Sequence, residues 1–155
     1  MREKHLSVLQ IFNRYLEYGG EEEVVKNIES TLQRSMEVMT YTGASAEILK
    51  KPGGKFMMPF LMQKNRSALK DLKKLQAEHQ FDLWLVHNVF PSLSVAVYEL
   101  AAELGVKVIQ YLHNYRFGCA NAAYFRKGTA CKECRPGSWM PAIKNRCWRG
   151  SLPAT

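Results

Sequence analysis

Four cysteines in the last third of the 155-residue chain have a spacing that suits metal binding. They are Cys119, Cys131, Cys134 and Cys147, in the pattern C-x11-C-x2-C-x12-C. A C-x2-C pair is a common half of a tetrahedral zinc site, in which thiolates are preferred ligands. The second half is not a pair, because Cys119 and Cys147 each stand alone. The pattern therefore predicts either a structural zinc site of four thiolates or, as the alternative, free thiols or an incidental disulfide.

Three further polar clusters come after apolar runs, at places where a rigid element could present a side chain to a ligand. They are Gly19-Gly20, His87-Asn88, and His113-Asn114-Tyr115-Arg116. Paired glycines before a helix let backbone N–H groups approach a phosphate or a sugar hydroxyl, although a tight turn is the favoured explanation. The next three residues, Glu21 to Glu23, are glutamates and argue against a bare anion site.

The two histidines in these clusters differ in their neighbours along the chain. His113 ends a strand that is expected to be buried, and polar residues follow it, which suits a side chain that hydrogen-bonds a ligand from a rigid base. His87-Asn88 stands just before Phe90-Pro91, which indicates a turn and favours a structural role. A single histidine is often structural, so the neighbouring clusters carry much of the argument for His113.

The elements that must position these clusters alternate along the chain. Strands are predicted over residues 7–12, 37–42, 81–86 and 107–112, and helices over 21–35, 65–79 and 92–104. Residues 43–64, rich in glycine and proline, are expected to form an irregular connection. The order predicts an α/β fold, a doubly wound, mostly parallel, Rossmann-like sheet. All three polar clusters then lie beyond the carboxyl ends of strands, where such sheets bind ligands.

Composition indicates one soluble globular domain over 1–155, with 46% hydrophobic and 23% charged residues. No apolar run reaches the roughly 20 residues of a membrane span, and we expect a cytoplasmic protein. Residues 1–112 hold 14 Lys/Arg and 13 Asp/Glu, whereas residues 113–155 hold 8 Lys/Arg and Glu133 alone, so +7 of the net +8 lies in the second segment. That basic segment is either a solvated surface or a site for anions.

Four stretches carry a family resemblance: YGGEEEVV, FDLWLVHNVFPSLSVAVYELA, GVKVIQYLHNYRFGCANAAYFRKGTACKEC and AIKNRCWRGS. In these stretches the chain resembles the N-terminal, acceptor-binding domain of family-4 retaining glycosyltransferases. Those enzymes have the GT-B fold, in which two Rossmann-like domains face each other. The resemblance implies transfer of a sugar from a nucleotide-sugar to a glycan or glycolipid acceptor, in surface polysaccharide biosynthesis. It also implies that the C-terminal domain binds the donor.

The resemblance assigns roles to particular residues. His113 would be catalytic and face the donor sugar, Gly19 and Gly20 would border the diphosphate and acceptor, and Asn114, Tyr115 and Arg116 would line the same cleft. His87 and Asn88 are the remaining candidates for substrate binding. Two positions depart from the family, since Asn114 stands where aspartate is frequent and Leu85 where histidine is frequent. No catalytic metal is expected.

The family pattern would continue beyond Thr155 into a donor-binding domain, so we expect these residues to be a fragment that is inactive alone. Peripheral contact of the basic segment with an anionic membrane is a further expectation. Two alternatives remain open. One is a zinc-stapled module that binds nucleic acid through the aromatics of residues 113–155, which leaves the α/β pattern unused. The other is a non-catalytic partner subunit of a separate donor-binding chain.

Overall fold

The computed structural model describes residues 6–14, 19–50, 52–134, 137–148, 150–152 and 155. The chain divides into two compact units, Met1–Tyr111 and Leu112–Thr155. The second unit begins one residue before the basic segment 113–155.

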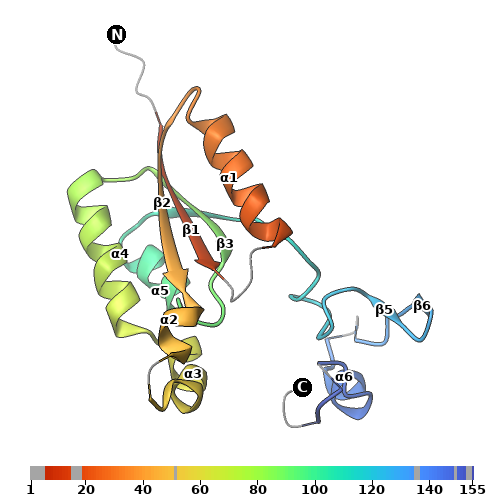
Figure 1. The fold of residues 1–155 in the computed structure, drawn as a ribbon. Helices are drawn as coiled ribbons and strands as arrows, with labels where there is room; N and C mark the ends of the chain where they lie inside the picture. The colour runs from red at the N-terminus through yellow and green to blue at the C-terminus, as the bar shows by residue number, and fades with distance from the viewer. Residues whose placement is uncertain (1–5, 15–18, 51, 135–136, 149, 153–154) are drawn as a thin grey trace. The chain divides into compact units, whose positions relative to one another are not determined.

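The first unit is built on a parallel sheet of four strands (Figure 1). In chain order the strands are β1 (Ser7–Arg14), β2 (Glu37–Ala44), β3 (Leu83–Asn88) and β4 (Lys107–Gln110), and their spatial order is β2-β1-β3-β4. Every predicted strand is therefore confirmed, with its ends moved by a few residues, and so is the parallel α/β sheet. β1 lies at the centre, which explains why six consecutive residues of it are buried.

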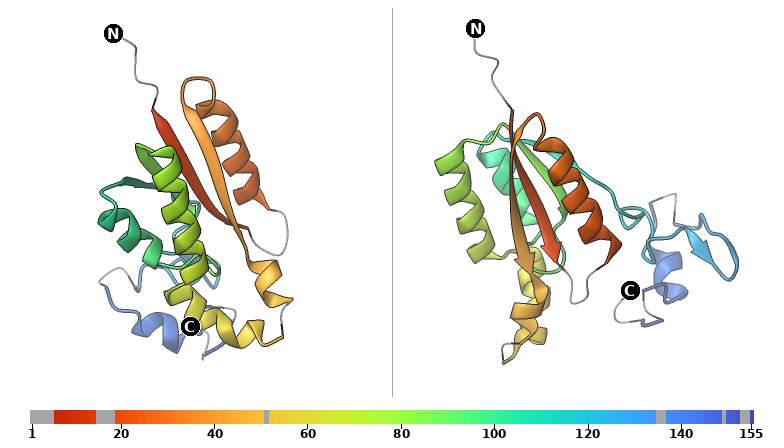
Figure 2. Two further views of the ribbon diagram at one scale, coloured as in Figure 1. Left: turned by 90° about the vertical axis from the view of Figure 1, so that its left-hand side faces the viewer. Right: turned by 45° about the horizontal axis from the view of Figure 1, so that its top comes forward.

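Helices cover both faces of this sheet, as the views in Figures 1 and 2 show. α1 (Gly20–Leu32) lies on one face, and α4 (Arg66–His79) and α5 (Ala96–Glu103) lie on the other. Side chains alternate along β1: Leu9 and Ile11 belong to the core cluster that contains Leu72 of α4 and Val97 of α5. Gln10, on the opposite face, reaches the backbone of α1. The arrangement is doubly wound.

Residues 43–64 differ from the predicted irregular connection, because they contain two helices. These are α2 (Ser45–Leu49) and α3 (Gly54–Gln63). The helix breakers mark the boundary between them: Gly53 takes a left-handed conformation, with φ 76°, at the start of α3. Pro59 lies inside α3, where it removes one backbone donor without ending the helix. The prediction was wrong because it counted these residues as breakers without regard to their positions.

The helix predicted from Ser92 begins later, at Ala96. Two features of the chain before it explain the delay. The backbone N–H and the hydroxyl of Ser92 both donate to Asn13 Oδ1, and Ser94 has φ 91°, which is incompatible with a helix. At the other end Gly105 has φ 67°, as expected for a glycine that ends a helix.

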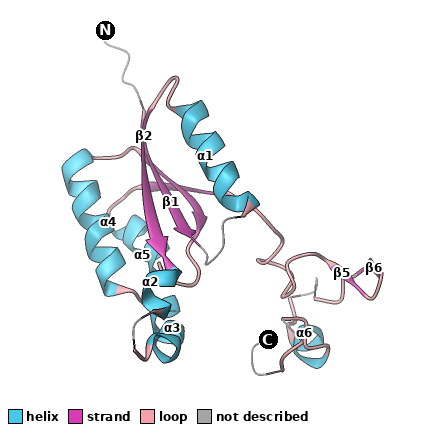
Figure 3. Ribbon diagram, viewed as in Figure 1, coloured by secondary structure: helices cyan, strands magenta, loops and turns pink. Residues whose placement is uncertain are grey.

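The described residues of the second unit form a small hairpin and a short helix (Figure 3). β5 (Phe125–Arg126) pairs antiparallel with β6 (Thr129–Ala130). The two residues between them, Lys127 and Gly128, both have positive φ, which is the geometry of a type I′ turn. α6 (Met140–Lys144) comes next along the chain. Across the described parts of both units, no helix has the length and apolarity needed to cross a bilayer.

Candidate functional site

The start of α1 and the end of β3 meet at the carboxyl edge of the sheet. Asn88 Nδ2, on the last residue of β3, donates to Glu21 Oε2 in the first turn of α1, at 3.5 Å. Gly19 is the N-cap of α1 and Gly20 its first residue. Two of the three polar clusters that the sequence singles out are thus neighbours in space, as their positions after parallel strands predict.

The two glycines are exposed, and their surroundings do not require glycine. A Cβ built on either one would meet no atom within 4 Å. Gly19 has φ −145° and ψ 176°, an extended conformation that any residue adopts. Neither packing nor backbone conformation therefore explains both glycines. Their bare backbone leaves the first turn of α1 open to a ligand.

An ion-pair network lies beside this open turn. Glu22 is 8% exposed, and its Oε1 lies 3.1 Å from Arg14 Nη2 and 3.6 Å from Lys26 Nζ. One carboxylate of the three-glutamate run is thus paired with two cations, which reduces the negative charge that the sequence alone suggested at this helix start.

His87 is buried, with 3% of its surface exposed, and takes part in a polar chain inside the first unit. Its Nε2 lies 2.9 Å from Gln10 Oε1, while Gln10 Nε2 donates to Thr40 Oγ1 at 3.0 Å. The ring also packs edge-on against Phe12, with centroids 6.5 Å apart. These contacts support the structural role that Phe90-Pro91 suggested, and they leave Asn88 as the more accessible of the pair.

Sequence reasoning missed two buried polar residues of β1, Gln10 and Asn13, both of them 0% exposed. Gln10 fixes the His87 ring, and Asn13 holds the loop before α5 through Ser92. The signal was present in the sequence, because a polar residue inside an apolar central strand must find a hydrogen-bond partner. Both residues hold the loops at the carboxyl edge in place.

The third polar cluster belongs to the second unit, where most of it lines one cavity. The buried strand expected before His113 is not observed: β4 ends at Gln110 and is mostly exposed, because it is an edge strand of the sheet. His113, Asn114 and Tyr115 surround a volume of about 350 Å³, together with Leu112, Phe117, Gly118 and Tyr124. A Cβ at Gly118 would overlap the Tyr124 hydroxyl and lie 3.1 Å from Tyr124 Cζ, so a larger residue there would displace the Tyr124 ring. Arg116 does not line this cavity: its guanidinium lies over the Trp148 ring, 4.6 Å from the centroid.

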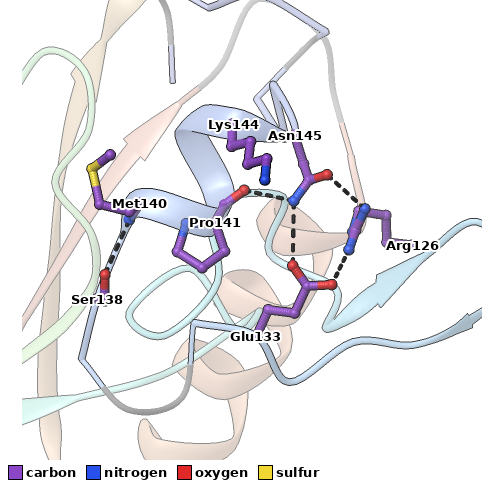
Figure 4. A pocket seen from close by; sticks show the side chains of 7 residues that line it. All are labelled: Arg126, Glu133, Ser138, Met140, Pro141, Lys144 and Asn145. Carbon is purple, nitrogen blue, oxygen red and sulfur yellow. Dashed lines mark hydrogen bonds and ion pairs between the residues drawn. The ribbon is translucent and has the colours of Figure 1, made fainter.

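A polar network joins the cysteine-containing loop to α6 (Figure 4). Arg126 Nη2 pairs with Glu133 Oε1, and Arg126 Nη1 donates to Asn145 Oδ1 at 2.8 Å. Asn145 Nδ2 in turn donates to Glu133 Oε2 at 3.3 Å. Glu133 lies between Cys131 and Cys134, and Asn145 lies two residues before Cys147. The network therefore fixes the Cys-x2-Cys loop against the segment that carries the last cysteine.

The four thiols lie close enough to influence one another. Burial is the largest cause that raises the pKa of Cys147 above its ordinary value, and the charges of Cys134, Cys119 and Cys131 raise it further, against Arg126, which lowers it. Cys119 Sγ donates to Asn121 Oδ1 at 2.8 Å. Within the described part of the chain, no three His, Cys, Asp or Glu side chains are arranged to hold one metal ion. The four-thiolate zinc site stays a prediction.

Comparison of this chain with family models, with curated proteins and with solved structures found no match.

Proposed function

We propose that this chain is the acceptor-side domain of a retaining glycosyltransferase of the GT-B type, which receives a glycan or glycolipid while a second domain binds the nucleotide-sugar. The observation that carries the proposal is the contact between Asn88 and Glu21 at the carboxyl edge of the sheet. It joins two segments, YGGEEEVV and LVHNVFP, that each belong to the family resemblance.

The chemistry of this edge suits a neutral, hydroxyl-rich ligand better than a free anion. The open backbone of Gly19-Gly20 offers N–H groups. The amide of Asn88 lies at the same edge, where its Nδ2 donates to Glu21 and its Oδ1 accepts a hydrogen bond from Phe90 N–H. Glu21 and Glu23 add carboxylates, which accept hydrogen bonds from sugar hydroxyls and repel phosphate. These residues support an acceptor sugar at the edge.

The role of His113 in this proposal comes from the resemblance. We propose that it faces the reacting sugar, and its place in the lining of a cavity, beside Asn114 and Tyr115, is compatible with a ligand contact. Arg116 is a weaker candidate, because its guanidinium is engaged with Trp148. In this proposal the contacts to the donor diphosphate come from a second domain.

Binding of soluble oligosaccharides, measured by ligand-observed NMR, tests the acceptor role. We expect a set of glycans to bind the wild-type chain, and Asn88→Ala to weaken that binding by about tenfold, the worth of one or two hydrogen bonds. Gly20→Val should weaken binding similarly, because it fills the open space over the helix start without touching the core.

Asn27→Ala is the matched control, because Asn27 is an exposed asparagine on the same helix. It should leave glycan binding unchanged. Equal binding by the wild-type chain and by both edge variants would contradict the proposed site. Binding of nucleotide-sugars in preference to glycans would contradict the acceptor role.

A further inference from the structure

The outer face of α3 exposes large apolar side chains that the core does not use. Phe56 is 84% exposed, Phe60 is 78% exposed and Met57 is 55% exposed, whereas the core phenylalanine Phe81 is 3% exposed. Phe56 and Phe60 are four residues apart, so they lie on the same face of the helix, with Met57 beside them. We call these three residues the α3 patch.

Partly buried side chains and hydrogen bonds on the other side of α3 fix the orientation of the helix, with the α3 patch facing outward. Met58, Leu61 and Met62 are partly buried, and Met58 and Met62 lie on the face opposite the patch. The carbonyl of Met62 accepts a hydrogen bond from Val95 N–H at 3.1 Å, and Asn65, the N-cap of α4, donates to Ser92 O. A small rotation that would bury Phe56 and Phe60 would break these bonds. The helix is therefore apolar on both faces, and one face has no cover within the described residues.

Positive charge surrounds the patch. Three basic residues that flank α3 along the chain are exposed: Lys50 before it, and Lys64 and Arg66 after it. From residue 48 to residue 70 the sequence has six Lys/Arg and no Asp/Glu. The nearest acidic residues along the chain are Glu47 and Asp71, and Asp71 accepts a hydrogen bond from the Tyr41 hydroxyl. The apolar face thus lies within a locally basic segment, although residues 1–112 as a whole are almost neutral.

We propose that the α3 patch binds the surface of an anionic membrane, with Phe56 and Phe60 inserted among the lipid chains and the basic residues against lipid phosphates. Short apolar faces with large side chains and flanking Lys or Arg bind the membrane–water interface. There the apolar side chains contact lipid chains and the basic side chains contact lipid phosphates. A second copy of the chain fits less well, because a two-fold contact would bring the two basic segments together. The membrane contact does not depend on the proposed transferase function.

The sequence predicted a membrane contact in the basic segment 113–155, whereas the present proposal assigns it to the α3 patch. Variants of the two surfaces should therefore differ in vesicle binding. Flotation of the full chain with phosphatidylglycerol–phosphatidylcholine vesicles distinguishes them. We expect the Phe56→Ser/Phe60→Ser variant to bind at least about tenfold more weakly than the wild-type chain. The matched control is Phe117→Ser/Phe125→Ser in the second unit, whose side chains are 67% and 53% exposed. It should bind like the wild-type chain.

Charge provides a second test that leaves the aromatic residues intact. Lys64→Gln/Arg66→Gln should weaken vesicle binding several-fold, and Lys73→Gln/Lys74→Gln, on the exposed side of α4, should not. Added salt should weaken wild-type binding, and vesicles of phosphatidylcholine alone should bind much less. Thermal unfolding shows whether each variant is folded.

Several results would overturn the proposal. One is unchanged vesicle binding by a folded Phe56→Ser/Phe60→Ser variant, and another is loss of binding only in the Phe117→Ser/Phe125→Ser control. Failure of the wild-type chain to bind anionic vesicles would do the same. A wild-type dimer that the Phe56→Ser/Phe60→Ser variant abolishes, seen by sedimentation velocity in the absence of lipid, would assign the patch to a second copy instead.

Discussion

Gln10 Oε1 on the central strand lies 2.9 Å from His87 Nε2 on the neighbouring strand, and both side chains are buried. The same glutamine bonds Thr40 on the other neighbouring strand, so one side chain links three strands of the sheet. Because no solvent reaches this place, the amide cannot be replaced by water. The link is part of what holds the carboxyl edge in one geometry.

Replacement of Gln10 by leucine removes this link at nearly constant volume. We expect Gln10→Leu to lower the free energy of unfolding by about 1–3 kcal/mol, since the His87 ring loses a buried hydrogen bond. Urea denaturation measures the change. Gln33→Leu, at an exposed glutamine after α1, is the control and should change stability by less than about 0.5 kcal/mol. Equal stability of the two variants would show that the buried pair contributes little.

Gly43, near the end of β2, is predicted to tolerate no side chain. A Cβ there would overlap the Leu93 side chain, with Leu93 Cγ only 2.7 Å away and Ser92 Oγ at 3.2 Å. Gly43→Ala should therefore destabilise the fold by about 1–3 kcal/mol through overpacking. Thermal unfolding measures the loss, and Gly20→Ala, where a Cβ meets nothing, should be neutral or stabilising.

Combining Gly43→Ala with Leu93→Ala tests whether overlap with Leu93 causes the loss of stability. Leu93→Ala alone should destabilise by opening a cavity, but in the Gly43→Ala background its cost should be smaller, because the added methyl group occupies part of the vacated space. Strict additivity of the two changes would mean that the overlap with Leu93 is not the cause.

Tyr41 should make stability fall at high pH. Burial, then the charge of Asp71 and the hydrogen bond to it, raise the pKa of Tyr41 from 10.0 to about 12. The folded state therefore favours the neutral phenol, and this contribution is complete below pH 10.0 and is lost as pH rises through about 12. Urea midpoints across this range should fall with pH in the wild-type chain and fall less in Tyr41→Phe.

Some pH dependence should remain in Tyr41→Phe, because burial also raises the pKa of Tyr98. The combined variant Tyr41→Phe/Tyr98→Phe should be flatter still. Parallel curves for the wild-type chain and Tyr41→Phe would mean that the Tyr41 phenol titrates alike in the folded and unfolded states.

The four cysteines predict metal content that can be measured directly. If their thiolates hold zinc, the chain purified with zinc should contain about one ion, and it should lose structure in the second unit when a chelator removes it. Cys131→Ser and Cys134→Ser should each abolish stoichiometric binding. Four titratable thiols with less than stoichiometric zinc would refute the site, and two or fewer titratable thiols without metal would indicate a disulfide.

The regular elements could be predicted wherever one periodic pattern dominated. The runs 7–12 and 81–86 are apolar because their strands are covered on both faces, and the leucine stripe of residues 65–79 is the face of α4 that packs on the core. α3 escaped prediction because it is apolar on both its buried and its exposed face, so it has no helical period to recognise.

The candidate site was only partly predictable for a different reason. The carboxyl-edge rule places the glycine pair and Asn88 together, but it cannot show that Gln10 and Asn13 are buried there, since their partners, His87 and Ser92, lie more than 70 residues away in the chain. Sequence spacing also could not predict that Arg116 differs from its neighbours. Its guanidinium lies over the Trp148 ring and does not line the cavity that His113 lines.

The central position of β1 has a consequence for synthesis of the protein. Residues 7–14 pair on one side with residues 37–44 and on the other with a strand that ends at Asn88. A nascent chain that has not yet released residues 83–88 from the ribosome presents one edge of an apolar strand with no neighbouring strand to cover it. Such edges recruit other chains. Chaperone binding during translation should therefore be strongest before β3 emerges.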